Sequence, residues 1–140
     1  MKIATRIALL LLAVLALLCF ASCADVETTG AWENATYTAD KTFGSGSKTV
    51  MVEVKAEEQS ITFTIKTDAG TLGEALMEND LIAGENGAYG LYIKTVNGIL
   101  ADYDVDGTYW ALTKNGEMLM TGADTTPIAD GEHYELTKAK

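Results

Sequence analysis

Alternation of apolar and polar residues is the clearest pattern in the middle of the chain. Apolar side chains occupy every second position from Val50 to Val54 and again from Ile61 to Ile65. A period of two places these side chains on one face of a β-strand. The segment 57–59 between the two runs is polar and short, so the pattern predicts two half-buried strands joined as a hairpin.

A helix is predicted after the hairpin. Thr71 and Glu74 have the spacing of a capping box, in which each side chain accepts a hydrogen bond from the other residue's backbone amide. Apolar residues then recur at helical spacing, which predicts a helix from Leu72 to about Ile82 with one face toward a sheet. Gly84 is the expected stop.

The remainder of the chain reads as short strands separated by turns. Asn97-Gly98 and Asn115-Gly116 are two-residue hairpin signals because both residue types accept positive φ, and Asp130-Gly131 marks a further turn. The expected strands are 91–96, 99–103, 109–113, 118–121 and 133–137. The order of elements predicts an α+β fold, β-grasp-like, with one helix packed on a mixed or antiparallel sheet that contains several β-hairpins.

The start of the chain has the pattern of a secretory signal. Lys2 and Arg6 precede an apolar run from Ile7 to Leu18, which is shorter than the roughly 20 residues of a membrane span. The segment Phe20-Ala21-Ser22-Cys23 resembles a bacterial lipobox, with Phe20 in place of the usual leucine. We therefore expect residues 1–22 to be removed and Cys23 to carry lipid, which anchors an extracytoplasmic protein to the bacterial cell membrane. The alternative is ordinary secretion.

Residues 23–47 are mostly small and polar, and they include a Gly-Ser repeat near their end, so we expect a lipidated cysteine and a flexible spacer. Trp32, Tyr37 and Phe43 are unusual in a linker, and the alternative is that part of this stretch pairs as an edge strand. The folded domain is expected over 48–140.

Charge and composition exclude several classes of function. The chain has 20 acidic and 10 basic residues, and no arginine follows Cys23. Nucleic-acid recognition depends on basic patches and arginine, so we expect no nucleic-acid partner. With Cys23 lipidated no free thiol remains, which excludes disulfides and a cysteine nucleophile. His133 and Ser60 lack the context of a catalytic triad, and we expect no enzymatic activity.

Several short motifs occur in a characteristic order. They are Thr71-Leu72 with Leu76, Val96-Asn97-Gly98, Ala101-Asp102-Tyr103, Gly107 with Tyr109-Trp110, Asn115-Gly116, and Asp130-Gly131-Glu132. From Thr71 to Lys138 the chain thus resembles a widespread uncharacterised domain of bacterial surface proteins, itself similar to the C-terminal β-domain of transcobalamin and intrinsic factor. The resemblance implies a β-grasp-related fold and contact with a cobalamin-like corrinoid or another small ligand.

Aromatic residues near turns, together with one turn asparagine, supply candidate ligand contacts. The candidate set is Tyr92, Asn97, Tyr103, Tyr109 and Trp110. Adjacent strand residues point to opposite faces, so Tyr109 and Trp110 cannot both enter one core, and one of them is expected at the surface. The alternative to a ligand platform is that Trp110 is a core residue and Tyr109 lies at a strand edge.

Three aspartates alternate at Asp102, Asp104 and Asp106, followed by Gly107, as in the first half of a calcium loop. The twelfth position is Thr113 rather than glutamate, and the flanks read as strands, so an EF-hand is excluded. Two interpretations stay open: a looser calcium or other metal site, and a solvated acidic turn.

These patterns favour a non-catalytic, lipid-anchored binding module for a small ligand or a surface partner protein. The rival interpretation is an adhesion or display domain that uses an exposed strand edge for protein contacts.

Overall fold

The computed structural model describes residues 29–140, and the predicted signal peptide 1–22 and Cys23 lie outside this range. The described residues form a six-stranded sheet in the order β1-β3-β2-β9-β7-β8 and a three-stranded sheet in the order β4-β5-β6. The strands are β1 (Lys41–Gly44), β2 (Lys48–Ala56), β3 (Gln59–Thr67), β4 (Ile82–Gly87), β5 (Gly90–Val96), β6 (Ile99–Leu100), β7 (Tyr109–Lys114), β8 (Glu117–Met118) and β9 (His133–Ala139). The helices are η2 (Gly30–Asn34), α2 (Leu72–Met77), α3 (Tyr103–Asp106) and η3 (Ala123–Thr125).

The six-stranded sheet is mixed. The β2-β3 hairpin is antiparallel over nine residues on each strand, which confirms the predicted hairpin. β1 adds to β3 in parallel, and β9 adds to β2 in parallel and to β7 antiparallel. This mixed sheet together with short helices confirms the α+β class.

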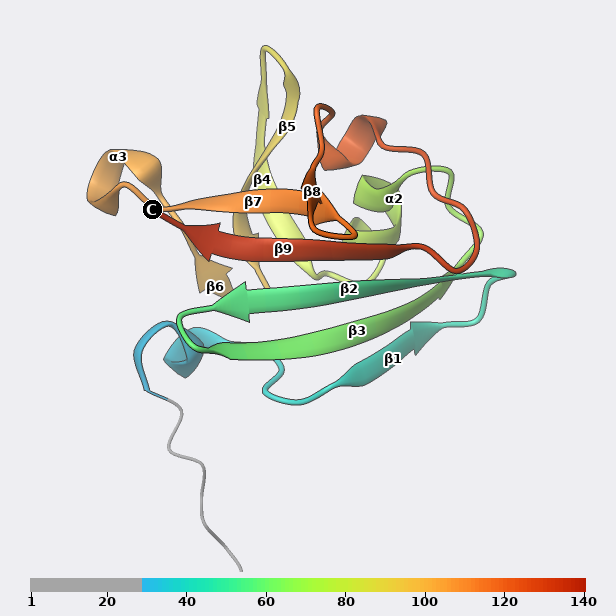
Figure 1. The fold of residues 1–140 in the computed structure, drawn as a ribbon, viewed down its shortest axis with the longest axis horizontal. Coiled ribbons are helices and arrows are strands. Elements are labelled where there is room, and N and C mark those ends of the chain that lie inside the picture. The colour runs from blue at the N-terminus through green and yellow to red at the C-terminus, as the bar shows by residue number, and fades with distance from the viewer. Residues whose placement is uncertain (1–28) are drawn as a thin grey trace, which may run out of the picture.

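One face of the six-stranded sheet forms most of the core. The alternating residues from Val50 to Ala56 in β2, from Ile61 to Thr67 in β3, and Tyr134 and Leu136 in β9 are at most 5% exposed, because α2 and the three-stranded sheet cover them. In Figure 1, β4, β5 and α2 lie behind β7 and β9. Buried residues of both sheets belong to a single apolar cluster, so the two sheets are packed as one body.

The segment before β2 corrects the expected spacer. Residues from Gly30 to Gly44 hold the helical turn η2 and the strand β1, so the fold begins well before Lys48. Trp32 is 1% exposed, and its indole N–H donates to the carbonyl of Ala56 at 2.9 Å. The rings of Tyr37 and Phe43 contact each other and Phe63 edge to face. The alternative, an edge strand within this stretch, is therefore confirmed for β1.

The capping box is confirmed, but the helix is shorter than predicted. Thr71 Oγ1 accepts from the amide of Glu74, and the Glu74 carboxylate accepts from the amide of Thr71, both at 3.3 Å. The helix ends at Met77, and Asp80 adopts φ 54 before the chain enters β4. The expected continuation to Ile82 is wrong, because this left-handed residue turns the chain into a strand.

We expect Thr71→Ala to lower the free energy of unfolding by about 1 kcal/mol, the usual contribution of a threonine N-cap. The change removes an acceptor from the first turn of α2 and leaves the helix face unchanged. Urea denaturation measures the difference. Thr42→Ala, on exposed β1, is the matched control, and an equal effect of the two substitutions would contradict the capping role.

Strand β4 was not predicted. The sequence pattern predicts the end of a helix at about Ile82 and a stop at Gly84, whereas the structure has a strand from Ile82 to Gly87. It pairs with β5 through a register shift between Ala83 and Gly84, and a Cβ at Gly84 would lie 2.0 Å from the carbonyl oxygen of Tyr92. Gly84 therefore permits close strand contact rather than ending a helix.

Both predicted Asn-Gly turns are confirmed. Asn97 and Asn115 have φ near 50°, and each following glycine also has positive φ. The expected strand 99–103 is wrong beyond Leu100, because α3 begins at Tyr103. The helices described by the structure include none long and apolar enough to cross a membrane.

Candidate functional site

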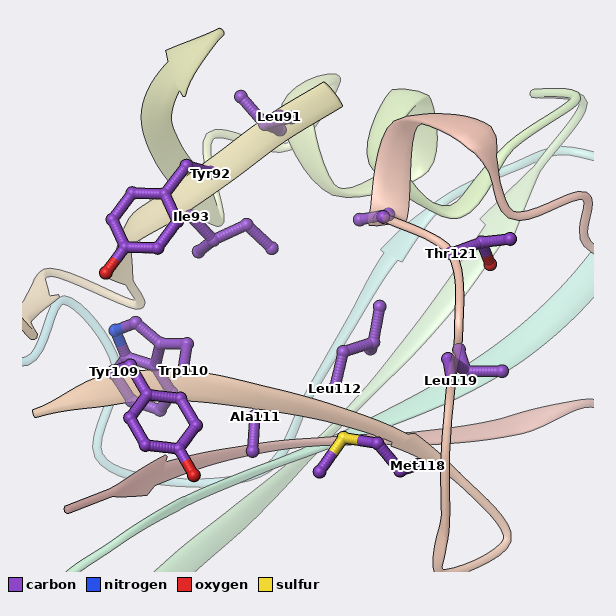
Figure 2. Close-up of a pocket in the computed structure, with 12 residues that line it drawn as sticks. Leu91, Tyr92, Ile93, Tyr109, Trp110, Ala111, Leu112, Met118, Leu119 and Thr121 are labelled. Carbon is purple, nitrogen blue, oxygen red and sulfur yellow. The ribbon is translucent and has the colours of Figure 1, made fainter. Parts of the chain in front are cut away.

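A groove of about 240 Å³ lies between the two sheets. Its walls are strand β5, strand β7 and the chain from Met118 to Ala123, as Figure 2 shows. Leu91, Tyr92 and Ile93 come from β5, Tyr109, Trp110, Ala111 and Leu112 from β7, and Met118, Leu119, Thr121, Gly122 and Ala123 from the third segment. The groove is thus mainly apolar, with tyrosine hydroxyls at one end.

Strand β7 splits its adjacent aromatic residues as the sequence predicts. Trp110 is 8% exposed, and its indole N–H donates to the Lys94 carbonyl at 3.2 Å, which joins β7 to β5. Tyr109 is 37% exposed on the other face of the strand. Tyr92 is 42% exposed, and in Figure 2 its ring lies at the same end of the groove as Tyr109. Three of the five candidate residues therefore meet at this site.

The other two candidates lie elsewhere. Asn97 is fully buried in the β5-β6 turn, where its side-chain oxygen accepts from the amide of Tyr37 at 2.9 Å and its side-chain NH₂ donates to the Tyr37 carbonyl at 2.7 Å. Both polar atoms of the Asn97 side chain are therefore hydrogen-bonded to the backbone of Tyr37, and neither is available to a ligand. Tyr103 is 63% exposed on α3 and does not line the groove.

The acidic segment forms the short helix α3 rather than a loop. Asp102 caps it by accepting from the amide of Asp104 at 3.1 Å, and Gly107 ends it with φ 75. The hydroxyl and then the amide of Thr108 donate to Asp106 and hold the pKa of its carboxyl below the ordinary value, against a smaller opposing effect of burial. Two of the three carboxylates therefore serve the local backbone.

Among residues 29–140, no group of three histidine, cysteine, aspartate or glutamate side chains is arranged to hold a metal ion. We expect a calorimetric titration with calcium to give a flat isotherm for the wild-type protein and for Asp104→Asn. Binding by the wild type that Asp104→Asn abolishes would instead support a cation site in α3.

The sequence pattern missed the apolar part of the groove. Ile93, Leu112 and Leu119 form its inner wall, yet each reads as an ordinary strand residue. The nearest sequence signal is Met118, an exposed apolar residue directly after the Asn115-Gly116 turn. It is 60% exposed, and together with half-exposed Tyr92 and Tyr109 it makes the rim of the groove apolar.

Comparisons with known proteins place this fold in a family. Residues 69–137 match the model of a domain of unknown function, DUF4430. A crystal structure from Ruminococcus gnavus, described as a "putative metal binding protein", is 41% identical, with a TM-score of 0.64, and the match covers 66% of this chain and 97% of that one. The chain belongs to the same family as that protein. No curated protein matches the chain.

A second solved structure is that of haptocorrin in complex with Cbi. It is 27% identical to this chain with a TM-score of 0.55, and the match covers 70% of this chain and 26% of haptocorrin. The chain therefore spans about a quarter of haptocorrin. This likeness agrees with the transcobalamin-type resemblance of the sequence.

Proposed function

We propose that the protein is a non-catalytic binding module of β-grasp type that holds a corrinoid-like small ligand against the groove between β5 and β7. The observation that carries the proposal is an apolar groove with two half-exposed tyrosines, in a domain that resembles part of haptocorrin solved with Cbi. A flat ligand can cover the tyrosine rings, while its polar edge stays in water.

The dimensions of the groove limit its affinity. At about 240 Å³ it accommodates only part of a corrinoid, and Trp110 is already buried by the protein itself. New burial therefore comes chiefly from Tyr92, Tyr109 and Met118. Covering about 200 Å² contributes at most on the order of 5 kcal/mol, which corresponds to a Kd of about 0.2 mM before any cost of association. We therefore expect the isolated domain to bind more weakly than this, with a Kd in the millimolar range.

Titration with cobinamide and with cobalamin, followed by absorbance and by calorimetry, tests this proposal. Tyr109→Ala is expected to weaken binding about five- to tenfold, because it removes the ring at the groove entrance. Tyr103→Ala is the matched control, since that tyrosine is 63% exposed and outside the groove. Absence of corrinoid binding at millimolar concentration, or equal losses in both variants, would contradict the proposal.

The proposed setting is the outer side of the bacterial cell membrane, with lipid on Cys23 as the anchor. Support comes from the lipobox-like segment before Cys23 and from an acidic chain, which anionic headgroups repel from the membrane surface. In the native organism, Cys23→Ser is expected to move the protein from the membrane fraction to the soluble fraction. Intact-mass detection of residues 1–22 on the native protein would contradict the anchor.

A further inference from the structure

Strand β7 has an open edge over its first half. The amide of Asn115 donates to the His133 carbonyl, so the odd-numbered residues of β7 direct their backbone groups toward β9. The amide of Leu119 donates to the Leu112 carbonyl, so the even-numbered residues face β8. β8 pairs only as far as Thr113, and the chain leaves after Leu119. Along the described chain, the N–H and C=O of Trp110 therefore have no strand opposite them, whereas Leu112 already faces Leu119.

The groove follows this open edge. Four consecutive residues of β7, 109–112, line it, although neighbouring side chains of a strand point to opposite faces. A hollow that contacts both faces of one strand lies against its edge. Across the groove, Leu91, Tyr92 and Ile93 of β5 form the opposite wall (Figure 2). The hollow thus combines unpaired backbone groups with apolar walls on both sides.

We propose that an extended segment of a partner protein adds to the β7 edge as an antiparallel strand in line with β8. Opposite Trp110, one peptide residue exchanges two backbone hydrogen bonds with it. Alternate side chains of the peptide then face the apolar wall of Ile93 and Leu119, and the others face solvent. This role goes beyond the proposed small-ligand function because it assigns the groove a second class of partner.

Charge identifies the kind of peptide. The chain carries 20 acidic and 10 basic residues, so a basic segment is attracted to it. Gly122 and Leu91 line one end of the groove, and Asp124 lies beside them. A Cβ atom built on Gly90 or on Gly122 would lie about 3 Å from the Asp124 carboxylate. One of its oxygens is buried with no hydrogen-bond partner among the residues described. An antiparallel peptide has its N-terminal end here, next to Leu112, so a lysine is expected at that end.

The test uses a capped hexapeptide with the sequence Lys-Val-Thr-Val-Thr-Val and two backbone N-methylated versions of it. One version is methylated at the odd-numbered peptide residues and the other at the even-numbered ones. A methyl group removes an N–H donor, so the set that faces β7 is expected to lose at least tenfold in affinity, and the other set much less. Calorimetry measures the three affinities. Equal affinities of the two methylated peptides, or no binding of the unmethylated one, would overturn the proposal.

Hydrogen exchange locates the contact. The amide of Trp110 is expected to gain protection when the hexapeptide binds, whereas the amide of Ala111, which already faces β9, is expected to change little. Protection elsewhere, with Trp110 unchanged, would overturn the assignment to this edge.

Asp124→Asn tests the charge argument, with an expected three- to tenfold loss of affinity for the lysine peptide and a smaller salt dependence. Asp106→Asn, on α3, is the matched control, and equal losses in both variants would overturn the placement of the lysine. Binding of the hexapeptide without any corrinoid binding would leave this inference standing and remove the proposed function. The reverse result would remove only this inference.

Discussion

Replacing Trp32 with alanine is expected to lower the free energy of unfolding by about 3 to 5 kcal/mol, the range for deleting a large buried aromatic side chain. Trp32 is 1% exposed and is among the largest buried side chains of the described residues. Its removal opens a cavity between η2 and the β2-β3 hairpin and takes the indole donor from the carbonyl of Ala56. Both effects act in the same direction, because the cavity loses contacts and the carbonyl loses its partner.

Urea denaturation of Trp32→Ala and Trp32→Phe separates the two contributions. Phenylalanine retains most of the apolar contact but not the N–H, so its loss is expected to be smaller than that of alanine. Tyr89→Ala serves as the surface control, because Tyr89 is 97% exposed. A Trp32→Ala midpoint equal to that of the wild type would mean that residues 30–34 do not belong to the cooperative unit, as the spacer interpretation predicts.

Local features of this fold could be predicted from the sequence, because their causes lie within a few residues. The β2-β3 hairpin follows from alternation on both sides of a short turn, and the start of α2 follows from the reciprocal pair Thr71 and Glu74. The turn at Asn97 follows from the positive φ that asparagine accepts. Each signal is complete within a single stretch of chain.

Long-range pairings could not be predicted in the same way. β9 inserts between β2 and β7, and β1 adds to β3 in parallel, so each pairing joins segments that share no turn. No local pattern specifies which edge a distant strand selects. The N-terminal segment illustrates the consequence. Its polar composition predicts a spacer, although three of its aromatic residues attach it to the core.

The candidate site was predicted in part for the same reason. Alternation along β7 is local, and it correctly separated exposed Tyr109 from buried Trp110. The groove itself requires β5, β7 and the segment after Met118 to meet, which depends on the packing of two sheets. Asn97 shows the opposite difficulty. The sequence predicts its turn, but the role of its side chain depends on Tyr37, which lies 60 positions away in the chain.

Asn97→Ala is expected to lower the free energy of unfolding by about 3 kcal/mol or more. The amide and the carbonyl of Tyr37 each lose a partner, at about 1 to 3 kcal/mol for a covered polar group. Alanine at φ 51 adds about 1 to 2 kcal/mol of left-handed strain. Asn97→Gly removes the same hydrogen bonds without this strain, so its smaller loss, measured by urea denaturation, isolates the two contributions.

The Asn97 variants also distinguish a structural residue from a ligand contact. Because the Asn97 side chain is fully buried and bound to Tyr37, the folded fraction of Asn97→Gly is expected to bind cobinamide as the wild type does. A variant that keeps wild-type stability but loses cobinamide binding would reverse the assignment and make Asn97 a ligand contact. The predicted result would instead mean that Asn97 connects the β5-β6 turn to the segment after η2. The amide of Thr36 in that segment also donates to the Asn97 carbonyl, at 2.8 Å. Asn97 and Trp32 then hold the same N-terminal segment from two sides, and loss of either is expected to release it from the core.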